Sequence, residues 1–125
     1  MAILLLATSC SGYLGVKKLG DRIYWDDKII VITKTDNYEG VGTCIIPPDI
    51  EKVKKDKKFV IVRTSNGKNQ IKYWLIDKMI EAKELEYVEA DSSYGGYSKY
   101  SNVYGPLDSV DFFNLKIQKG VNIKW

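Results

Sequence analysis

Apolar residues along this chain gather in short runs separated by polar turns, a pattern typical of antiparallel β-strands. The runs 22–25 and 28–33 flank an Asp-Asp turn, and the second run is rich in β-branched residues. A third run, 41–46, ends at two prolines, which cannot donate a hydrogen bond to a strand ladder. Because the run 28–33 is apolar on both faces, we expect it in the middle of a sheet.

A second hairpin is predicted further along the chain. Residues 58–64 and 71–77 are largely apolar runs, and between them lies Asn66-Gly67, the strongest local hairpin signal in the sequence. We expect these two strands to pair antiparallel. The charged segment 49–58 is compatible with a short helix or with an exposed turn.

The strand pattern is lost after residue 77. Residues 78–89 are compatible with a short helix that turns Met79, Ile80 and Leu85 inward. Residues 90–104 are rich in Ser, Gly and Tyr and have no core pattern, so we expect a long loop there.

The clearest helix signal lies near the C-terminus. Asp108 or Ser109 can cap its first turn, and Gly120 fits its end. One face of this helix carries the apolar side chains Val110, Phe113 and Ile117. We expect that face to pack on the sheet. The pattern predicts an α+β fold, an antiparallel sheet of about five strands with a C-terminal helix packed on it.

The N-terminus begins with an apolar run, Ala2 to Ala7, followed by Thr8, Ser9 and Cys10. A signal-peptide core needs roughly 7 to 15 apolar residues and a membrane-spanning helix about 20, so this run is too short to span a bilayer. We therefore expect an export signal, in which small residues admit a processing enzyme and the thiol accepts lipid. The alternative is a buried N-terminal strand or helix in which Cys10 is an ordinary core residue.

The segment Leu6-Ala7-Thr8-Ser9-Cys10 resembles the lipobox of bacterial lipoprotein precursors, whose cysteine becomes the first residue of the mature chain. The commonest lipobox has Leu three places before the cysteine and Gly or Ala immediately before it, whereas this chain has Ala7 and Ser9. No Lys or Arg precedes the apolar run, so we expect the reading frame to begin a few residues upstream.

The lipobox resemblance implies a division of the chain into three parts. Residues 1–9 would be a lipoprotein-type signal peptide, residues 10–20 a lipid anchor and tether, and residues 21–125 a single α+β domain. Lipid on Cys10 would attach the protein to a bacterial membrane without spanning it. We expect it in the cell envelope, facing the periplasm or the exterior.

Charge and cysteine content narrow the functional classes. The chain has 19 basic and 16 acidic residues, and its net charge of +3 is too mild to predict nucleic-acid binding. It has no histidine, so a Cys-His catalytic pair is impossible and no His/Cys metal pattern occurs. Cys44 lies among apolar residues, where a free cysteine is most often a small buried hydrophobe.

Motifs for catalysis and cofactor binding are lacking in the sequence. Residues 40–42 lack the third glycine of a dinucleotide-binding loop, and no phosphate-loop Gly-Lys-Ser/Thr occurs. The candidate carboxylate pairs are Asp26-Asp27, Asp49-Glu51 and Asp108-Asp111. Turns, solvent exposure and helix capping explain these pairs, so we expect no catalysis, no cofactor and no metal.

Two segments offer contacts for a partner. Five of the nine tyrosines fall in one Gly/Ser-rich stretch, and such a composition is typical of binding loops. These are Tyr87, Tyr94, Tyr97, Tyr100 and Tyr104, of which Tyr94, Tyr97 and Tyr100 are the candidate ligand contacts. The alternative is that the tyrosines simply cover the sheet. The basic run 52–58 offers phosphate or acidic-membrane contacts, or is a solvated turn.

The C-terminal half carries a second resemblance. The segments 59–62 and 72–78, then Tyr104-Gly105-Pro106-Leu107 and the helix that ends at Lys119-Gly120-Val121, are similar to small bacterial lipoproteins grouped as domains of unknown function. This resemblance implies an exported lipoprotein and supplies no activity and no site residues.

The first functional hypothesis is a membrane-anchored lipoprotein of the cell envelope that acts as a non-catalytic binding or interaction module for a protein or envelope ligand. The alternative is a cytosolic immunity or inhibitor protein that binds an enzyme partner and keeps residues 1–9. A third hypothesis, an envelope hydrolase that uses carboxylates, requires an essential acidic pair.

Overall fold

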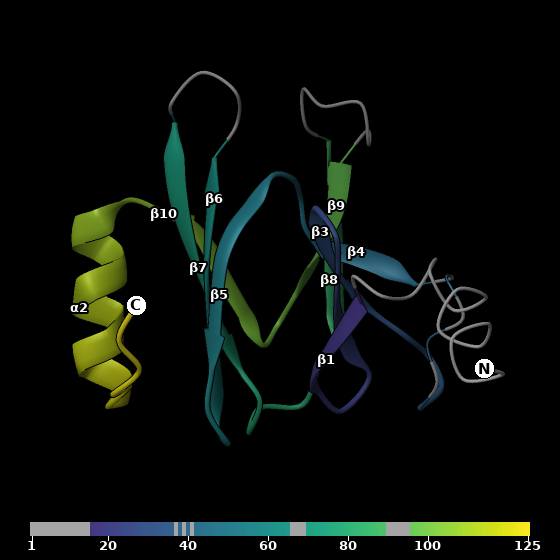
Figure 1. The fold of residues 1–125 in the computed structure, drawn as a ribbon, viewed down its shortest axis with the longest axis horizontal. Coiled ribbons are helices and arrows are strands. Elements are labelled where there is room, and N and C mark those ends of the chain that lie inside the picture. The colour runs from purple at the N-terminus through teal and green to yellow at the C-terminus, as the bar shows by residue number, and fades with distance from the viewer. Residues whose placement is uncertain (1–15, 37, 39, 41, 66–69, 90–95) are drawn as a thin grey trace, which may run out of the picture.

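The computed structural model describes residues 16–36, 38, 40, 42–65, 70–89 and 96–125, which form ten strands and a C-terminal helix (Figure 1). The elements are β1 (Val16–Gly20), β2 (Ile23–Asp26), β3 (Ile29–Ile32), β4 (Thr43–Ile46), β5 (Ile50–Lys55), β6 (Phe59–Ser65), β7 (Ile71–Asp77), β8 (Glu84–Glu89), β9 (Gly96–Tyr100), β10 (Val103–Leu107) and α2 (Ser109–Lys119).

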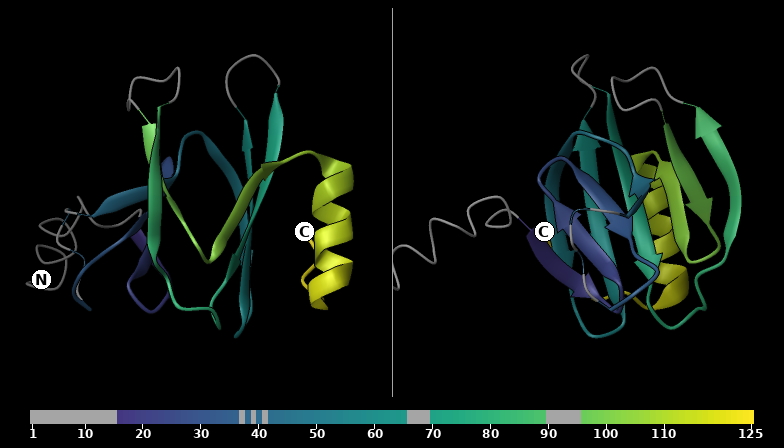
Figure 2. Two further views of the ribbon diagram at one scale, coloured as in Figure 1. Left: turned by 180° about the vertical axis from the view of Figure 1, so that it is seen from behind. Right: turned by 90° about the vertical axis from the view of Figure 1, so that its right-hand side faces the viewer.

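The described elements stack in three layers (Figures 1 and 2). The N-terminal sheet has the order β1-β2-β3-β4, and the β8–β9 hairpin lies beside it because β9 contacts β4. The central sheet has the order β10-β7-β6-β5, and α2 covers its other face. Every strand pair is antiparallel, so the α+β architecture is confirmed, with a larger β portion than expected.

The central sheet is buried on both faces, which explains the unbroken apolar run 59–62. Alternate side chains of a strand point to opposite faces. Val60 and Val62 therefore pack toward the N-terminal sheet, with Trp74 of β7 in the same cluster. Phe59 and Ile61 pack in a second cluster that includes Phe112 of α2. The sheet thus separates two hydrophobic cores.

Helix α2 has the capping that its sequence predicts. The Asp108 side chain accepts a hydrogen bond from the Asp111 backbone N–H at 2.8 Å, and Gly120 ends the helix at a φ of 69°. Phe112 is only 4% exposed and stacks on Tyr73 of β7 at 4.9 Å between ring centroids. This ring pair holds the helix on the central sheet.

The prediction of which face of α2 packs on the sheet is wrong. Val110, Phe113 and Ile117 point to solvent and are each more than 60% exposed, whereas Phe112 and Leu115 face the sheet. The helix has two apolar stripes, so periodicity alone does not choose between them. The stacking of Phe112 on Tyr73 and Trp125 determines which stripe faces the sheet.

A partly buried ion pair fastens the end of α2 to the end of β7. Lys119 Nζ lies 3.1 Å from Asp77 Oδ2 and 4.6 Å above the centre of the Tyr104 ring, and Asp77 Oδ1 accepts the Met79 N–H at 3.0 Å. Burial alone would lower the pKa of Lys119, but hydrogen bonds to Tyr104 and Asp77 outweigh it and raise the pKa above its ordinary value. The Ile-Asp step at the end of β7 therefore serves the fold.

Several segments that the sequence pattern left as helix, turn or loop are strands. Residues 50–55 form edge strand β5, in which Ile50 and Val53 pack inward between solvated lysines. Residues 84–89 form β8, which is paired with β9. Residues 16–20, expected in the tether, form β1 and pair with β2.

The predicted long loop at 90–104 is also wrong over its described part, which contains β9 and the start of β10. Gly96 within this segment and Gly105 just after it serve close packing. A Cβ on Gly105 would lie 2.7 Å from Cε3 of Trp74, so only glycine lets β10 lie against that ring. The Asn66-Gly67 turn lies outside the described residues, but its strands, β6 and β7, pair antiparallel as expected.

Replacing the neighbouring phenylalanines of α2 tests the orientation of the helix. We expect Phe112→Ala to lower the free energy of unfolding by about 3 kcal/mol, because it removes the ring that fills the second core. Phe113→Ala, the matched control, should change it by less than about 0.5 kcal/mol because that ring is already in water. Urea unfolding followed by tryptophan fluorescence measures both, and the reverse order of effects would contradict the observed face.

Candidate functional site

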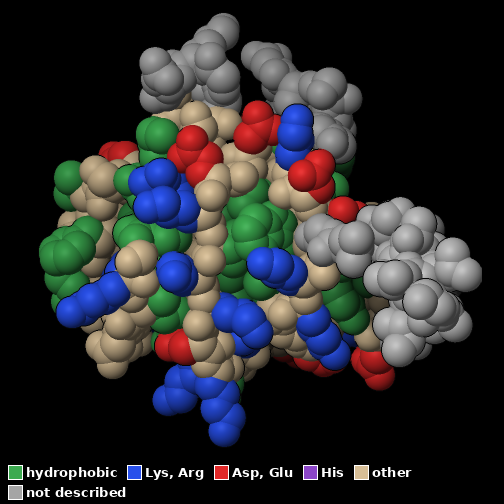
Figure 3. Space-filling model, in the orientation of Figure 1, with side chains coloured by type: hydrophobic (Ala, Val, Ile, Leu, Met, Phe, Trp, Pro, Cys, Tyr) green, Lys and Arg blue, Asp and Glu red, His purple; other side chains and the backbone are tan. Residues whose placement is uncertain are grey.

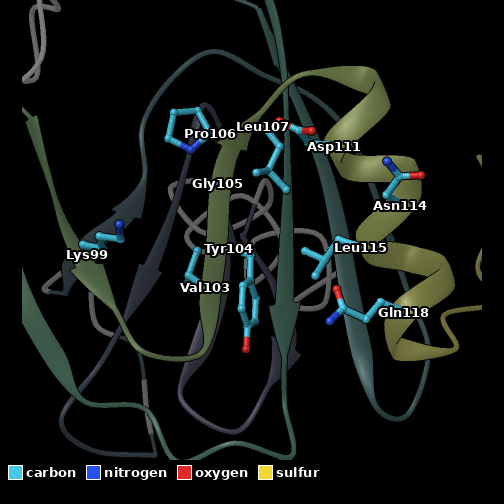
Figure 4. Close-up of a pocket in the computed structure, with 10 residues that line it drawn as sticks. All are labelled: Lys99, Val103, Tyr104, Gly105, Pro106, Leu107, Asp111, Asn114, Leu115 and Gln118. Atoms are coloured by element: carbon cyan, nitrogen blue, oxygen red, sulfur yellow. The ribbon is translucent and has the colours of Figure 1, made fainter.

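A hollow of about 560 Å³ lies between β10 and α2 (Figure 4). Its walls come from the end of β9, the whole of β10 and one side of the helix. The lining residues are Lys99, Val103, Tyr104, Gly105, Pro106, Leu107, Asp111, Asn114, Leu115 and Gln118. The hollow exists because β10 bends away at Gly105, where the register of its pairing with β7 shifts.

The hollow combines an apolar floor with a polar rim. Leu115 and Gln118 point from α2 toward β10, and the Tyr104 ring lies between the two elements (Figure 4). Lys99 stands on the β9 side and Asp111 on the helix side, so the rim carries one charge of each sign. Such a surface suits contact with a polar chain or side chain.

The lining offers little chemistry beyond binding. Asp111 is its one carboxylate, and it is exposed in the first turn of α2. General acid–base catalysis by carboxylates normally uses two such groups in different environments. None of the ten lining residues is a serine, cysteine or histidine. The lining offers one carboxylate, one ammonium group and several hydrogen-bonding groups as contacts.

The outward side of α2 is the most apolar exposed feature near this hollow. Val110, Phe113 and Ile117 form what we call the outer α2 stripe, with exposures of 65%, 62% and 64%. Figure 3 shows hydrophobic side chains at the outer edge of the molecule over this helix. Such a stripe is a candidate contact surface, because burying its side chains against a partner would remove them from water.

The candidate tyrosines do not form one surface. Tyr97 is 8% exposed and meets the Trp74 ring edge-on at 5.5 Å, so it belongs to the core between the sheets. Tyr100 is half-buried; burial and the charge of Glu84 raise its pKa. Tyr94 lies outside the described residues.

Tyr87 and Tyr104, the first and last tyrosines of the group, also lie on different surfaces. Tyr87 on β8 is exposed, and Tyr104 lies under Lys119 at the edge of the hollow. The description of these tyrosines as cover for the sheet fits Tyr97 best.

The candidate carboxylates have structural partners. The Tyr38 hydroxyl donates to Asp26, Glu51 pairs with Arg63 at 3.0 Å, and Asp108 caps α2. Across the described ranges, no cluster of three or more acidic, cysteine or histidine side chains could hold a metal ion.

Cys44 lies on β4, partly buried against the core between the sheets. Its Sγ lies 3.4 Å from the Ile46 carbonyl oxygen, to which it donates. Burial raises the pKa of the thiol to about 11, although the hydrogen bond to Ile46 opposes the shift. A thiol that stays protonated is a poor nucleophile, so Cys44 has the character of a core residue. Cys10 lies outside the described residues.

Sequence reasoning found the apolar positions of the outer α2 stripe but assigned them to the core. It missed the hollow altogether, because its walls meet only through the pairing of β10 with β7. The spacing of Phe112 and Leu115, a second apolar stripe on the same helix, was the signal that could have warned of two faces.

Comparisons with protein-family models, with curated proteins and with solved structures found no match. The described helix is neither long enough nor apolar enough to cross a membrane.

The reactivity of Cys44 should follow its raised pKa. In a Cys10→Ser variant, where Cys44 is the remaining thiol, we expect reaction with a disulfide reagent at pH 8 to be about 100-fold slower in the folded chain than in urea. The folded rate should rise with each pH unit toward about pH 11, because thiolate accumulates only there. A fast folded reaction that levels off near pH 8 would show an activated thiol instead.

Proposed function

We propose that this protein is a non-catalytic binding module of the bacterial cell envelope, anchored to a membrane by lipid on Cys10, that uses the outer α2 stripe to contact a protein partner. The single observation that carries the binding half is the exposure of Val110, Phe113 and Ile117 on one side of a helix that packs on the central sheet through Phe112 and Leu115.

The geometry of the stripe favours a partner with an apolar groove. Its side chains stand at positions i, i+3 and i+7, the spacing at which a helix presents anchors to a hydrophobic groove. Burying each of them is worth roughly 1.5–3 kcal/mol before the losses of association are counted. The hollow beside β10 lies on the same helix, so it can receive polar groups at the border of such a contact.

The anchoring half of the proposal is supported by the sequence of residues 1–10. Counted with Met1, the apolar run is seven residues long, the lower limit of a signal-peptide core, and small residues precede Cys10. At about 0.8 kcal/mol for each buried methylene, one acyl chain holds a protein only marginally, whereas two hold it stably.

The alternative is a cytosolic inhibitor that binds an enzyme through the same stripe. It differs from the first proposal at the N-terminus, since an inhibitor of this kind keeps residues 1–9 and an unmodified Cys10. The surface argument is common to both, and the state of Cys10 separates them.

Intact mass and membrane partition of the protein test the anchor. The full upstream reading frame is expressed in a Gram-negative host beside Cys10→Ala. We expect a mature chain that begins at Cys10, heavier by its acyl chains and found with the membrane, and a variant that is unprocessed or released. An unmodified chain that keeps residues 1–9 in the soluble fraction would contradict the anchor and favour the inhibitor.

Photo-crosslinking tests the stripe. A photoreactive amino acid at position 113 should give a discrete product with one other protein, and adding Val110→Ser and Ile117→Ser should abolish it. The matched control at exposed Lys34, two residues after β3, should give no such product. Equal products from both positions would reject the stripe, and a product of two copies of this chain would assign it to self-association instead of a partner.

A further inference from the structure

A second, basic hollow lies where β1, the β5–β6 turn and the end of β7 meet, away from the outer α2 stripe. It has a volume of about 570 Å³ and is lined by Lys18, Leu19, Gly20, Lys55, Asp56, Lys57 and Lys78. These residues come from β1, from the end of β5 and the turn that follows it, and from the residue after β7. Figure 3 shows Lys and Arg side chains gathered on the lower half of one face, over β5, the turn that follows it and β1.

The fold brings these lysines together, because only some of them belong to the basic run 52–58. Lys55 and Lys57 belong to the run 52–58, but Lys18 and Lys78 come from distant parts of the chain. No ion pair within the described ranges involves any of these four lysines. Their charges are therefore available to an anion from outside.

The acidic residue of the hollow does not neutralise it. Asp56 Oδ1 accepts the backbone N–H groups of Lys58 and Phe59, both at 2.8 Å, and so holds the turn. One carboxylate faces four lysines, which leaves the hollow strongly positive.

The lysines of the hollow repel one another, as the environment of Lys78 shows. Its Nζ donates to the Leu19 carbonyl oxygen at 2.9 Å, which joins the end of β7 to β1 and leaves the ammonium two further N–H donors. Burial lowers its pKa and the charge of Lys55 lowers it further, and these two effects outweigh the opposing charge of Asp56. An anion in the hollow would relieve that repulsion.

We propose that this hollow binds the phosphates of acidic phospholipid headgroups, as a second contact with the membrane that holds Cys10. The inference rests on the proposed lipid anchor for its choice of phosphate source. A fully extended chain spans at most about 3.6 Å per residue, so the six residues from Cys10 to Val16 keep β1 within roughly 20 Å of the lipid. Lys18 lies on that strand, two residues further on.

The combination of one lipid signal and a basic patch is physically effective. A single acyl chain binds a membrane reversibly, and basic residues near an anionic surface each add a factor of about five to partitioning. The attraction acts within about 8 Å at physiological salt, so it needs the hollow to face the surface. The tether keeps β1 within roughly 20 Å of the lipid, a range that includes such an approach.

Vesicle sedimentation tests the proposal with the unlipidated full chain carrying Cys10→Ser. The vesicles are phosphatidylcholine with and without phosphatidylglycerol. We expect binding only to the anionic vesicles, weakened by added salt. Lys18→Ala with Lys55→Ala and Lys57→Ala should reduce it by roughly 100-fold. The matched control, Lys34→Ala with Lys72→Ala and Lys124→Ala, removes the same charge from exposed sites elsewhere and should reduce it less than about threefold.

Each contrary result has a distinct meaning. Equal losses in the two triple variants would overturn the site, because net charge alone would then explain binding. Equal binding to both kinds of vesicle would overturn the headgroup. Inorganic phosphate that binds the hollow, with no preference for anionic vesicles, would assign it to free phosphate compounds. Since lipid on Cys10 plays no part here, failure of the anchor is scored separately by the intact mass.

Discussion

The burial of β6 and β7 on both faces is the constraint on which the rest of this structure depends. An apolar strand that is exposed on either side loses the burial that stabilises it, so each face of the central sheet needs its own cover. The N-terminal sheet covers one face through Ile30, Ile45 and their neighbours. Helix α2 covers the other through Phe112. Neither cover is dispensable, because each closes a separate core.

The two proposed contact surfaces follow from how these covers are used. Helix α2 packs one apolar stripe against the central sheet, and its second stripe faces outward. At the end of the sandwich, β1 and the β5–β6 turn approach each other around Lys78, and the lysines that cannot enter the core collect there. The stripe and the basic hollow are thus products of the same packing, and they lie on different sides of the molecule, free to act on different partners.

Strong local signals in the sequence predicted most of the sheet, while tertiary contacts decided the rest. The β-branched run at 28–33 and the paired runs around Asn66-Gly67 gave β3, β6 and β7, and the caps gave α2. Residues 96–104 looked like a loop because their Gly, Ser and Tyr residues show no core pattern, and Gly105 just beyond them is required against Trp74. The basic hollow could not be predicted, because its lysines meet only after β1 reaches the end of β7.

The position of α2 after every described strand also bears on how the chain is made. During synthesis the strands leave the ribosome first, so the face of the central sheet that carries Phe59, Ile61 and Leu75 has no cover until residue 112 emerges. A chain that pauses before that point presents an open apolar surface to chaperones and to other nascent chains. Among the described elements, the helix is therefore the last to cover the central sheet.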